Sequence, residues 1–336
     1  MIKNSNVLIL SVKFFNYEKL IMDELISMGA NVDLYDERPS NSFYSKAIIR
    51  VKKDFLQRRI NRYFQSIIDK IKGKKYDYFL LIKGESTPRF FLEFLKMDNS
   101  AIKLIYYTYD SFKNNPNGLD NLGLFDKKFT FDRADSKKYN LSFRPLFFAS
   151  DYSKINKQGS IGPFYDIAFI GTAHSDRYSL SQKLDKWCTI NHFKMFNFYY
   201  SPSKLLFVLN RLTDKNFKKF DREKISFHSL THQEIINIYS KSKSILDINH
   251  PGQEGLTMRT FEALGAGCKL ITTNENVKSY PFYNENNICV VERHNPKIDK
   301  EFFDKEFEQI DGELYQLMSL NGWIKELFEY ESNIWQ

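Results

Sequence analysis

The residues best suited to chemistry lie in residues 244–274, which read as a strand, a loop, a short helix, a glycine-rich stop and a strand. Thr257 is a candidate N-cap of that helix, and Arg259 and Glu262 share one helix face because they are three residues apart. An arginine offers paired donors to a phosphate, whereas an ionised glutamate accepts hydrogen bonds from hydroxyl groups. This combination predicts binding of a nucleotide through its phosphate and ribose. The alternative is an Arg–Glu pair on a solvated helix face.

The elements around this helix predict an α/β fold with two doubly wound sheets, because short apolar runs alternate with helical patterns. We predict strands at 6–12, 31–35, 77–82, 102–107, 127–131, 165–170, 193–198, 224–228, 244–248, 268–273 and 287–291. We predict helices at 17–29, 53–72, 88–96, 176–190, 202–212, 231–242, 257–266, 300–309 and 311–330. A helix that begins at the carboxyl edge of such a sheet presents backbone N–H groups to an anion.

The length of 336 residues is that of two domains. The best linker is residues 151–163, which are polar, contain glycine and proline and show no periodicity. We therefore predict a first domain over 1–155, a second over 164–310 and a helical tail over 311–336.

Glu254 and Glu262 stand eight residues apart, and the run GLTMRTFEALGAG follows the first of them. This stretch resembles the E-x7-E motif of retaining GT-B glycosyltransferases, which use nucleotide sugars. It is most similar to the group 1, spore-maturation-protein-like branch found in capsule and O-antigen assembly. The resemblance implies two Rossmann-like domains facing an interdomain cleft, with the donor on the second and the acceptor on the first. It also implies that Glu262 holds the ribose and that Glu254 is a catalytic residue near the donor sugar.

The same resemblance extends the expected donor site to other loops that follow strands. Gly171 and Arg177 would contact the diphosphate, and the loop before Thr231 would read the base through its backbone. An ordinary strand-to-helix turn is the alternative at the loop of Gly171 and Arg177. The complete predicted donor-binding set is Gly171, Thr172, Arg177, His228, Ser229, Leu230, Gly255, Leu256, Thr257, Arg259 and Glu262.

Two carboxylates in the first half follow predicted strands and are candidate catalytic bases. Glu85 comes after the strand at 77–82, and Asp110 comes after the strand at 102–107. A carboxylate there could deprotonate an acceptor hydroxyl if its surroundings raised its pKa towards neutrality. The alternative for each is a helix cap or a turn residue.

The net charge of +8 comes mainly from residues 46–75, which hold eleven basic and two acidic side chains. Apolar residues recur there at three- and four-residue steps, which predicts an amphipathic helix with a cationic outer face. Such a face suits an anionic membrane surface, and a solvated helix packed on its own sheet is the alternative. Nucleic acid is not expected as a partner, because no recognition motif accompanies the charge.

Several classes of protein are disfavoured by what the sequence lacks. Three dispersed cysteines, with no C-x-x-C pair, argue against disulfides or structural zinc and favour a reducing cytoplasm, and no apolar run reaches 18 residues. There is no Asp-x-Asp pair, so we expect no metal and no cofactor in the transfer. A G-x-G-x-x-G after a strand, a P-loop and a G-x-S-x-G elbow are also absent.

The expected function is transfer of a sugar from a nucleotide diphosphate to a glycan or lipid-linked acceptor for a bacterial surface polysaccharide. The protein would be cytoplasmic, with peripheral contact to the membrane. The first alternative is an epimerase or hydrolase of nucleotide sugars on the same fold. The second is a non-catalytic scaffold that binds nucleotide sugars.

Overall fold

The computed structural model describes residues 2–40, 53–155 and 164–335, and the chain divides into two compact units. Unit 1 comprises Met1–Leu146 together with Leu320–Gln336, and unit 2 comprises Phe147–Ser319. Residues 156–163 of the expected linker and residues 46–52 of the basic segment lie outside the described residues. No described helix is both long and apolar enough to cross a membrane.

Unit 1 contains a sheet of six parallel strands in the order β2-β1-β3-β4-β5-β6. Its strands are β1 (Asn6–Ser11), β2 (Asn31–Asp36), β3 (Tyr78–Ile82), β4 (Lys103–Thr108), β5 (Lys127–Thr130) and β6 (Ser142–Phe143). Its helices are α1 (Tyr17–Ser27), α3 (Gln57–Ile71), α4 (Arg89–Asp98), α5 (Arg133–Tyr139) and α14 (Leu320–Phe328), with a 3₁₀ turn η1 (Lys53–Leu56) before α3.

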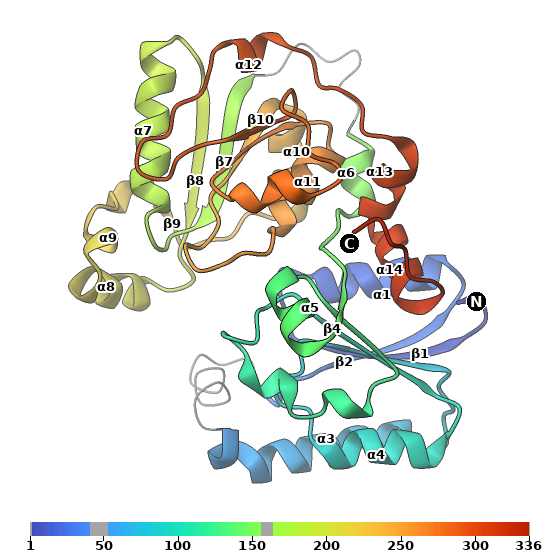
Figure 1. Cartoon of the computed structure of the whole chain (residues 1–336). Helices are drawn as coiled ribbons and strands as arrows, with labels where there is room; N and C mark the ends of the chain where they lie inside the picture. The colour runs from blue at the N-terminus through green and yellow to red at the C-terminus, as the bar shows by residue number, and fades with distance from the viewer. Residues whose placement is uncertain (1, 41–52, 156–163, 336) are drawn as a thin grey trace. The chain divides into compact units, whose positions relative to one another are not determined.

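Helices cover both faces of this sheet, as its nearly continuous apolar strands require. α3 and α4 run along one face (Figure 1), where Phe64 of α3 and Phe91 of α4 pack with Phe79 of β3. α14 covers the other face, where the rings of Tyr107 and Trp323 lie 4.7 Å apart between centroids. The apolar stripe of α3 is therefore buried in its own core, and only its cationic face is exposed.

The C-terminal residues are divided between the two units at Ser319. The helix expected over 311–330 is two helices, because Ser319 has an extended backbone after α13 (Gly312–Met318). Residues 320–336 belong to unit 1 and residues 147–155 belong to unit 2, so the observed boundaries differ from the expected 1–155, 164–310 and 311–336. Sequence patterns predict local structure. The unit to which a terminal segment belongs depends instead on packing partners that are distant in the chain.

Unit 2 contains a second six-stranded parallel sheet, in the order β12-β11-β10-β7-β8-β9. Its strands are β7 (Tyr165–Thr172), β8 (Met195–Tyr200), β9 (Ile225–Ser226), β10 (Ser242–Asp247), β11 (Lys269–Thr272) and β12 (Ile288–Val290). Its helices are α6 (Ser150–Ser153), α7 (Arg177–Ile190), α8 (Lys204–Thr213), α9 (Lys215–Lys218), α10 (His232–Ser240), α11 (Met258–Gly265), α12 (Glu301–Asp304) and α13.

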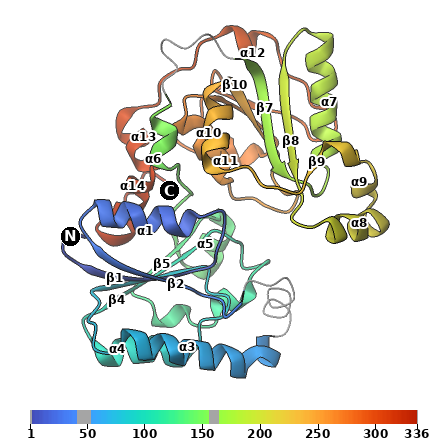
Figure 2. The same cartoon turned by 180° about the vertical axis from the view of Figure 1, so that it is seen from behind.

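Helices α7 and α12 cover one face of this second sheet, and α10 and α11 cover the other (Figure 2). α11 approaches its neighbours closely, because a Cβ added at Gly265 would lie 2.4 Å from the ring of Phe148. Tyr315 of α13 donates a hydrogen bond to the carbonyl of Gly265 at 2.7 Å. The glycine at the end of α11 thus allows close helix packing.

The expected α/β class with two parallel sheets is confirmed, and every expected strand is present within a few residues. The sequence patterns missed the short elements α5, β6, α6 and α9. The helix expected over 300–309 ends at Asp304. These short elements contain too few residues to show a period of their own.

Candidate functional site

Asp247, the last residue of β10, anchors the start of α11 in unit 2. Its carboxylate is buried and accepts hydrogen bonds from the hydroxyls of Thr257 at 2.8 Å and Thr260 at 3.1 Å. Arg259 Nη1 donates to the same carboxylate at 3.2 Å. Thr257 is the N-cap of α11, as expected, and it accepts a hydrogen bond from the backbone N–H of Arg259. The N-terminus of α11 is thereby fixed at the carboxyl edge of the sheet.

Arg177 lies at the same edge, at the start of α7. Its Nε donates to the carbonyl of Ile248 at 2.9 Å, and its Nη1 donates to the carbonyl of Thr172 at 3.3 Å. Burial lowers the pKa of Arg177 to about 10, and the charge of Arg259 acts in the same direction. Arg177 therefore stays charged at neutral pH and connects the carboxyl ends of β7 and β10.

Arg293, which follows β12, joins this group and was not expected from the sequence. It forms an ion pair with Asp176 at 2.8 Å, and its Nη2 donates to Asn249 Oδ1 at 2.6 Å and to Thr273 Oγ1 at 3.2 Å. The only available signal was its position a few residues after a predicted strand. We call Arg177, Arg259 and Arg293 the arginine cluster.

The arginine cluster makes this edge of unit 2 electrostatically positive. Its three guanidinium groups lie among two carboxylates, Asp176 and Asp247. Burial, together with the charge of Arg177, lowers the pKa of His174 to about 3. A positive region at a helix N-terminus attracts an anion such as a phosphate.

The low pKa of His174 predicts how stability depends on pH. Unfolded histidine takes up a proton near pH 6.5, whereas folded His174 does so only near pH 3. The unfolded state therefore binds more protons between these values, and stability falls as the pH falls through them, by at most about 1.4 kcal/mol per pH unit. Urea unfolding at pH 6.5, 5.5 and 4.5 should show a smaller loss in His174→Gln than in the wild type. Equal losses in both proteins would contradict this assignment.

The remaining predicted donor residues lie on loops of unit 2 with different environments. Glu262 is buried in α11, whereas the side chain of Glu254 is exposed. The carbonyl of Glu254 accepts hydrogen bonds from the amides of Asn274 at 3.0 Å and Asn276 at 3.1 Å. These two asparagines hold the loop that contains the buried residues Gly255 and Leu256.

Gly171 lies near the end of β7, and its contact with the diphosphate stays a prediction. A Cβ at this position would come 2.6 Å from the ring of Phe169. Packing against this ring is a second, structural reason for a glycine at this position. Thr172 ends the strand, and its carbonyl accepts from Arg177.

The loop of His228, Ser229 and Leu230 follows β9 at the edge of the sheet. His228 and Ser229 are exposed, and Ser226 Oγ donates to the carbonyl of His228 at 2.6 Å. Thr231 caps α10 in a capping box with Glu234, as expected. The loop therefore leads into a capped α10, and its residues His228 and Ser229 remain exposed.

Glu85 in unit 1 is a buried partner of two cations. Its side chain is 0% exposed, with Lys83 Nζ 2.8 Å from Oε1 and Arg38 Nε 2.6 Å from Oε2. Burial raises the pKa of this carboxyl, but the charges of Lys83 and Arg38 outweigh burial and hold it below its usual value. A general base needs an accessible carboxylate with a pKa nearer neutrality, so this geometry does not favour Glu85 for that task.

Asp110 is the more accessible of the two predicted bases. Its side chain is 24% exposed, and its Oδ2 lies 3.1 Å from Lys83 Nζ. Lys83 has a φ of +87°, and its carbonyl accepts hydrogen bonds from Tyr106 and Asn115 at 2.9 Å. This strained backbone places one ammonium between Glu85 and Asp110. Sequence patterns missed Arg38 and Lys83, although both charged residues follow predicted strands.

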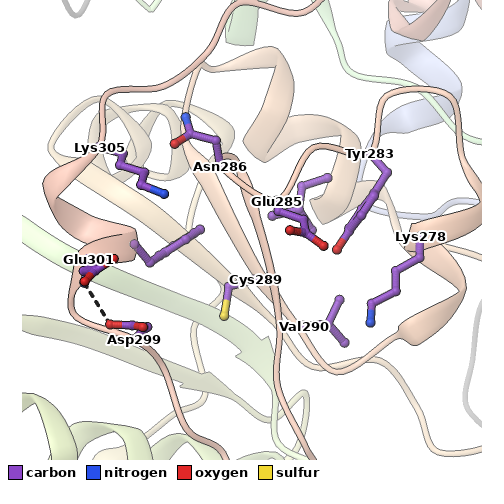
Figure 3. Close-up of a pocket in the computed structure, with 11 residues that line it drawn as sticks. Lys278, Tyr283, Glu285, Asn286, Cys289, Val290, Asp299, Glu301 and Lys305 are labelled. Carbon is purple, nitrogen blue, oxygen red and sulfur yellow. Dashed lines mark hydrogen bonds between the residues drawn. The ribbon is translucent and has the colours of Figure 1, made fainter.

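A cavity of about 360 Å³ lies beside the edge strand β12, apart from the predicted donor residues (Figure 3). Its lining residues are Lys278, Tyr283, Glu285, Asn286, Ile288, Cys289, Val290, Asp299, Glu301, Phe302 and Lys305. Burial, and then the charge of Asp299, raise the pKa of the Cys289 thiol to about 11, so it is protonated at neutral pH. This cavity contains no member of the arginine cluster. Among the residues described, no group of three or more histidine, cysteine, aspartate or glutamate side chains could hold a metal.

Part of unit 2 is similar to a known protein family. Residues 214–308 match a family model described as glycosyl transferase-like. This range includes α11, Arg259 and Arg293. No curated protein matches the chain.

Solved structures resemble the chain over nearly its whole length. One is an alpha-glucosyltransferase in complex with UDP and a 13-mer DNA, with a TM-score of 0.58 and 12% identity over 98% of this chain and 97% of that one. A glycosyltransferase from Rickettsia africae has a TM-score of 0.57 and 16% identity over 98% and 100%. A putative UDP-N-acetylglucosamine 2-epimerase from Listeria monocytogenes has a TM-score of 0.52 and 11% identity over 97% of each chain. At these identities the likeness establishes the fold, which is GT-B with two Rossmann-like domains.

Proposed function

We propose that this protein is a glycosyltransferase that binds a nucleotide-diphosphate sugar on unit 2 and transfers the sugar to an acceptor. The observation that carries the proposal is the arginine cluster at the N-terminus of α11. Its support is a glycosyl transferase-like family match over 214–308 and a GT-B fold. A diphosphate leaving group gains negative charge during transfer, and fixed guanidinium groups would stabilise that charge.

In this proposal the arginines bind the diphosphate, and Glu262 accepts hydrogen bonds from the ribose hydroxyls. A guanidinium has five N–H donors, so an arginine that pairs with Asp247 can also bind a phosphate. Transfer would retain the anomeric configuration and need no metal, with Glu254 near the donor sugar. The support for retention is the E-x7-E resemblance, and the anomeric configuration of the product tests it.

The acceptor in this proposal is a glycan or lipid-linked saccharide of a bacterial surface polysaccharide. Its support is the resemblance of residues 254–267 to enzymes of capsule and O-antigen assembly. Asp110 would take the proton of the acceptor hydroxyl. A 2-epimerase on the same fold would instead convert the donor with no acceptor present, and a scaffold would bind the donor without changing it.

Arg259→Ala is expected to weaken binding of a nucleoside diphosphate by about 100-fold, because hydrogen bonds to charged groups contribute about 1.5–3 kcal/mol each. Asp247 keeps its two threonine donors in this variant, so the fold should persist. Isothermal titration against the nucleotide that binds best is the measurement. Arg259→Lys, which keeps the charge, should lose less.

Arg222→Ala is the matched control, because it removes the same charge from an exposed turn of unit 2. It should bind with wild-type affinity. If Arg259→Ala kept wild-type affinity, or if Arg222→Ala lost as much, the arginine cluster would not be the phosphate site.

A further inference from the structure

Helix α8 exposes an apolar stripe that no described part of the chain covers. Leu205, Val208, Leu209 and Leu212 are 70%, 50%, 50% and 71% exposed. Their spacing of three and four residues places them on one helix face. We call these four residues the α8 stripe. An exposed apolar patch of this kind marks an interaction surface.

The α8 stripe is held facing outwards by a buried residue of the same helix. Phe207 is 2% exposed, and its ring lies 5.9 Å from that of Phe217 and 6.4 Å from that of Phe220. α8 and α9 lie together beside the end of β8 (Figures 1 and 2). The orientation of the stripe is therefore fixed by the core of unit 2.

The segment that contains the α8 stripe is rich in basic side chains. Residues 204–224 contain seven basic and three acidic side chains, a net charge of +4. The exposed lysines near the stripe are Lys204, Lys215, Lys218 and Lys219, and the acidic residues of the segment are Asp214, Asp221 and Glu223. An apolar helix face with a cationic border is complementary to a surface of anionic lipids.

We propose that α8 and α9 dock the protein on an anionic lipid bilayer, with the α8 stripe inserted among the headgroups and the lysines against lipid phosphates. A ten-residue helix is about 15 Å long, so it lies in the interface and does not span the membrane. Pairing with a second copy is disfavoured, because it would bring two cationic borders together.

Helix α3, the other strongly basic helix, lacks the apolar part of such a surface. Its apolar residues Ile60, Phe64, Ile67, Ile68 and Ile71 are buried against unit 1. Its outer arginines Arg58, Arg59 and Arg62 are exposed. α3 therefore exposes basic side chains but no apolar face that could insert into a membrane. It provides a matched control for the effect of charge alone.

The test is co-sedimentation of the full chain with vesicles of phosphatidylcholine containing 30% phosphatidylglycerol. We expect the wild type to bind, and Leu205→Asn/Leu212→Asn to lower the partition coefficient at least tenfold. Lys215→Gln/Lys218→Gln/Lys219→Gln should lower it about a hundredfold, since each basic residue contributes near the surface. These positions are exposed, so melting temperatures should stay close to that of the wild type.

Two control variants distinguish vesicle binding through the α8 stripe from binding through basic or apolar residues elsewhere on the surface. Arg58→Gln/Arg59→Gln/Arg62→Gln, on α3, and Met97→Asn/Ile190→Asn, at exposed apolar positions elsewhere, should each change binding less than threefold. The proposal is overturned if the wild type fails to bind these vesicles, or if the α3 variant loses as much as the lysine variant. It is also overturned if sedimentation velocity shows a lipid-free dimer that Leu205→Asn/Leu212→Asn converts to a monomer.

Discussion

Asp110→Asn is expected to lower the rate of sugar transfer by about 10²–10⁴-fold, the usual contribution of a general base. Asparagine keeps the size of the side chain but cannot accept the proton of the acceptor hydroxyl. Donor binding needs only unit 2 in our proposal, so the Kd of the nucleotide should not change. Initial rates at saturating donor, together with titration of the nucleotide, measure both quantities.

Asp98→Asn is the control for this experiment, because Asp98 is an exposed aspartate of unit 1 at the end of α4. It should transfer at the wild-type rate. A fall of less than tenfold in Asp110→Asn would exclude Asp110 as the base. Glu85→Gln tests the other predicted base. A large loss of transfer with an unchanged melting temperature would assign the role of general base to Glu85 instead.

Glu326→Ala is expected to lower the free energy of unfolding by about 3–5 kcal/mol, because it leaves a buried arginine without its carboxylate. Arg144 and Glu326 form an ion pair in which each side chain is 2% exposed. Trp335 Nε1 donates to Glu326 Oε2 at 3.1 Å, and the Arg144 guanidinium lies 5.0 Å from the Trp335 ring. This cluster connects residues 320–335 to the rest of unit 1 through Arg144. Urea unfolding of the variant and the wild type measures the loss.

The double variant Arg144→Met/Glu326→Leu provides the matched comparison. It replaces both charges by apolar groups of similar size, a change that often restores stability. We expect it to be more stable than Glu326→Ala. If Glu326→Ala unfolded at the wild-type urea concentration, the cluster would not hold the C-terminal segment in place.

The fold could be predicted from the sequence because its signals are local. Each central strand is an apolar run of about five residues, such as Tyr78–Ile82, and parallel strands buried on both faces require such runs. The N-caps Thr231 and Thr257 were predicted for the same reason, since a cap contacts backbone only two or three residues away. The unit boundaries were not predictable in this way, because the place of α14 depends on contacts with residues such as Tyr107.

The candidate site was predicted only where its members are close in sequence. Arg259 could be predicted because Glu262 lies three residues away on the same helix. Its partner Asp247 could not, because it is twelve residues away on another element. Arg293 donates a hydrogen bond to Asp176, which is 117 residues away in the sequence, and Arg38 donates one to Glu85, which is 47 residues away. No spacing rule connects such pairs, although each follows a strand on the same edge of its sheet. Gly171 was predicted from its place after a strand, and the structure adds a packing restraint from Phe169 at the same position.

The central claim is that the arginine cluster of unit 2 binds the diphosphate of a nucleotide sugar. The most direct test is the melting temperature of the full chain against UDP, GDP, dTDP, ADP and CMP and their sugar conjugates. At about 100 times its Kd a ligand stabilises the native protein by about 2.7 kcal/mol. We predict a clear rise with one nucleoside diphosphate and its sugar, and a much smaller rise in Arg259→Ala at the same concentration. A melting temperature unmoved by every compound would contradict the proposed donor site.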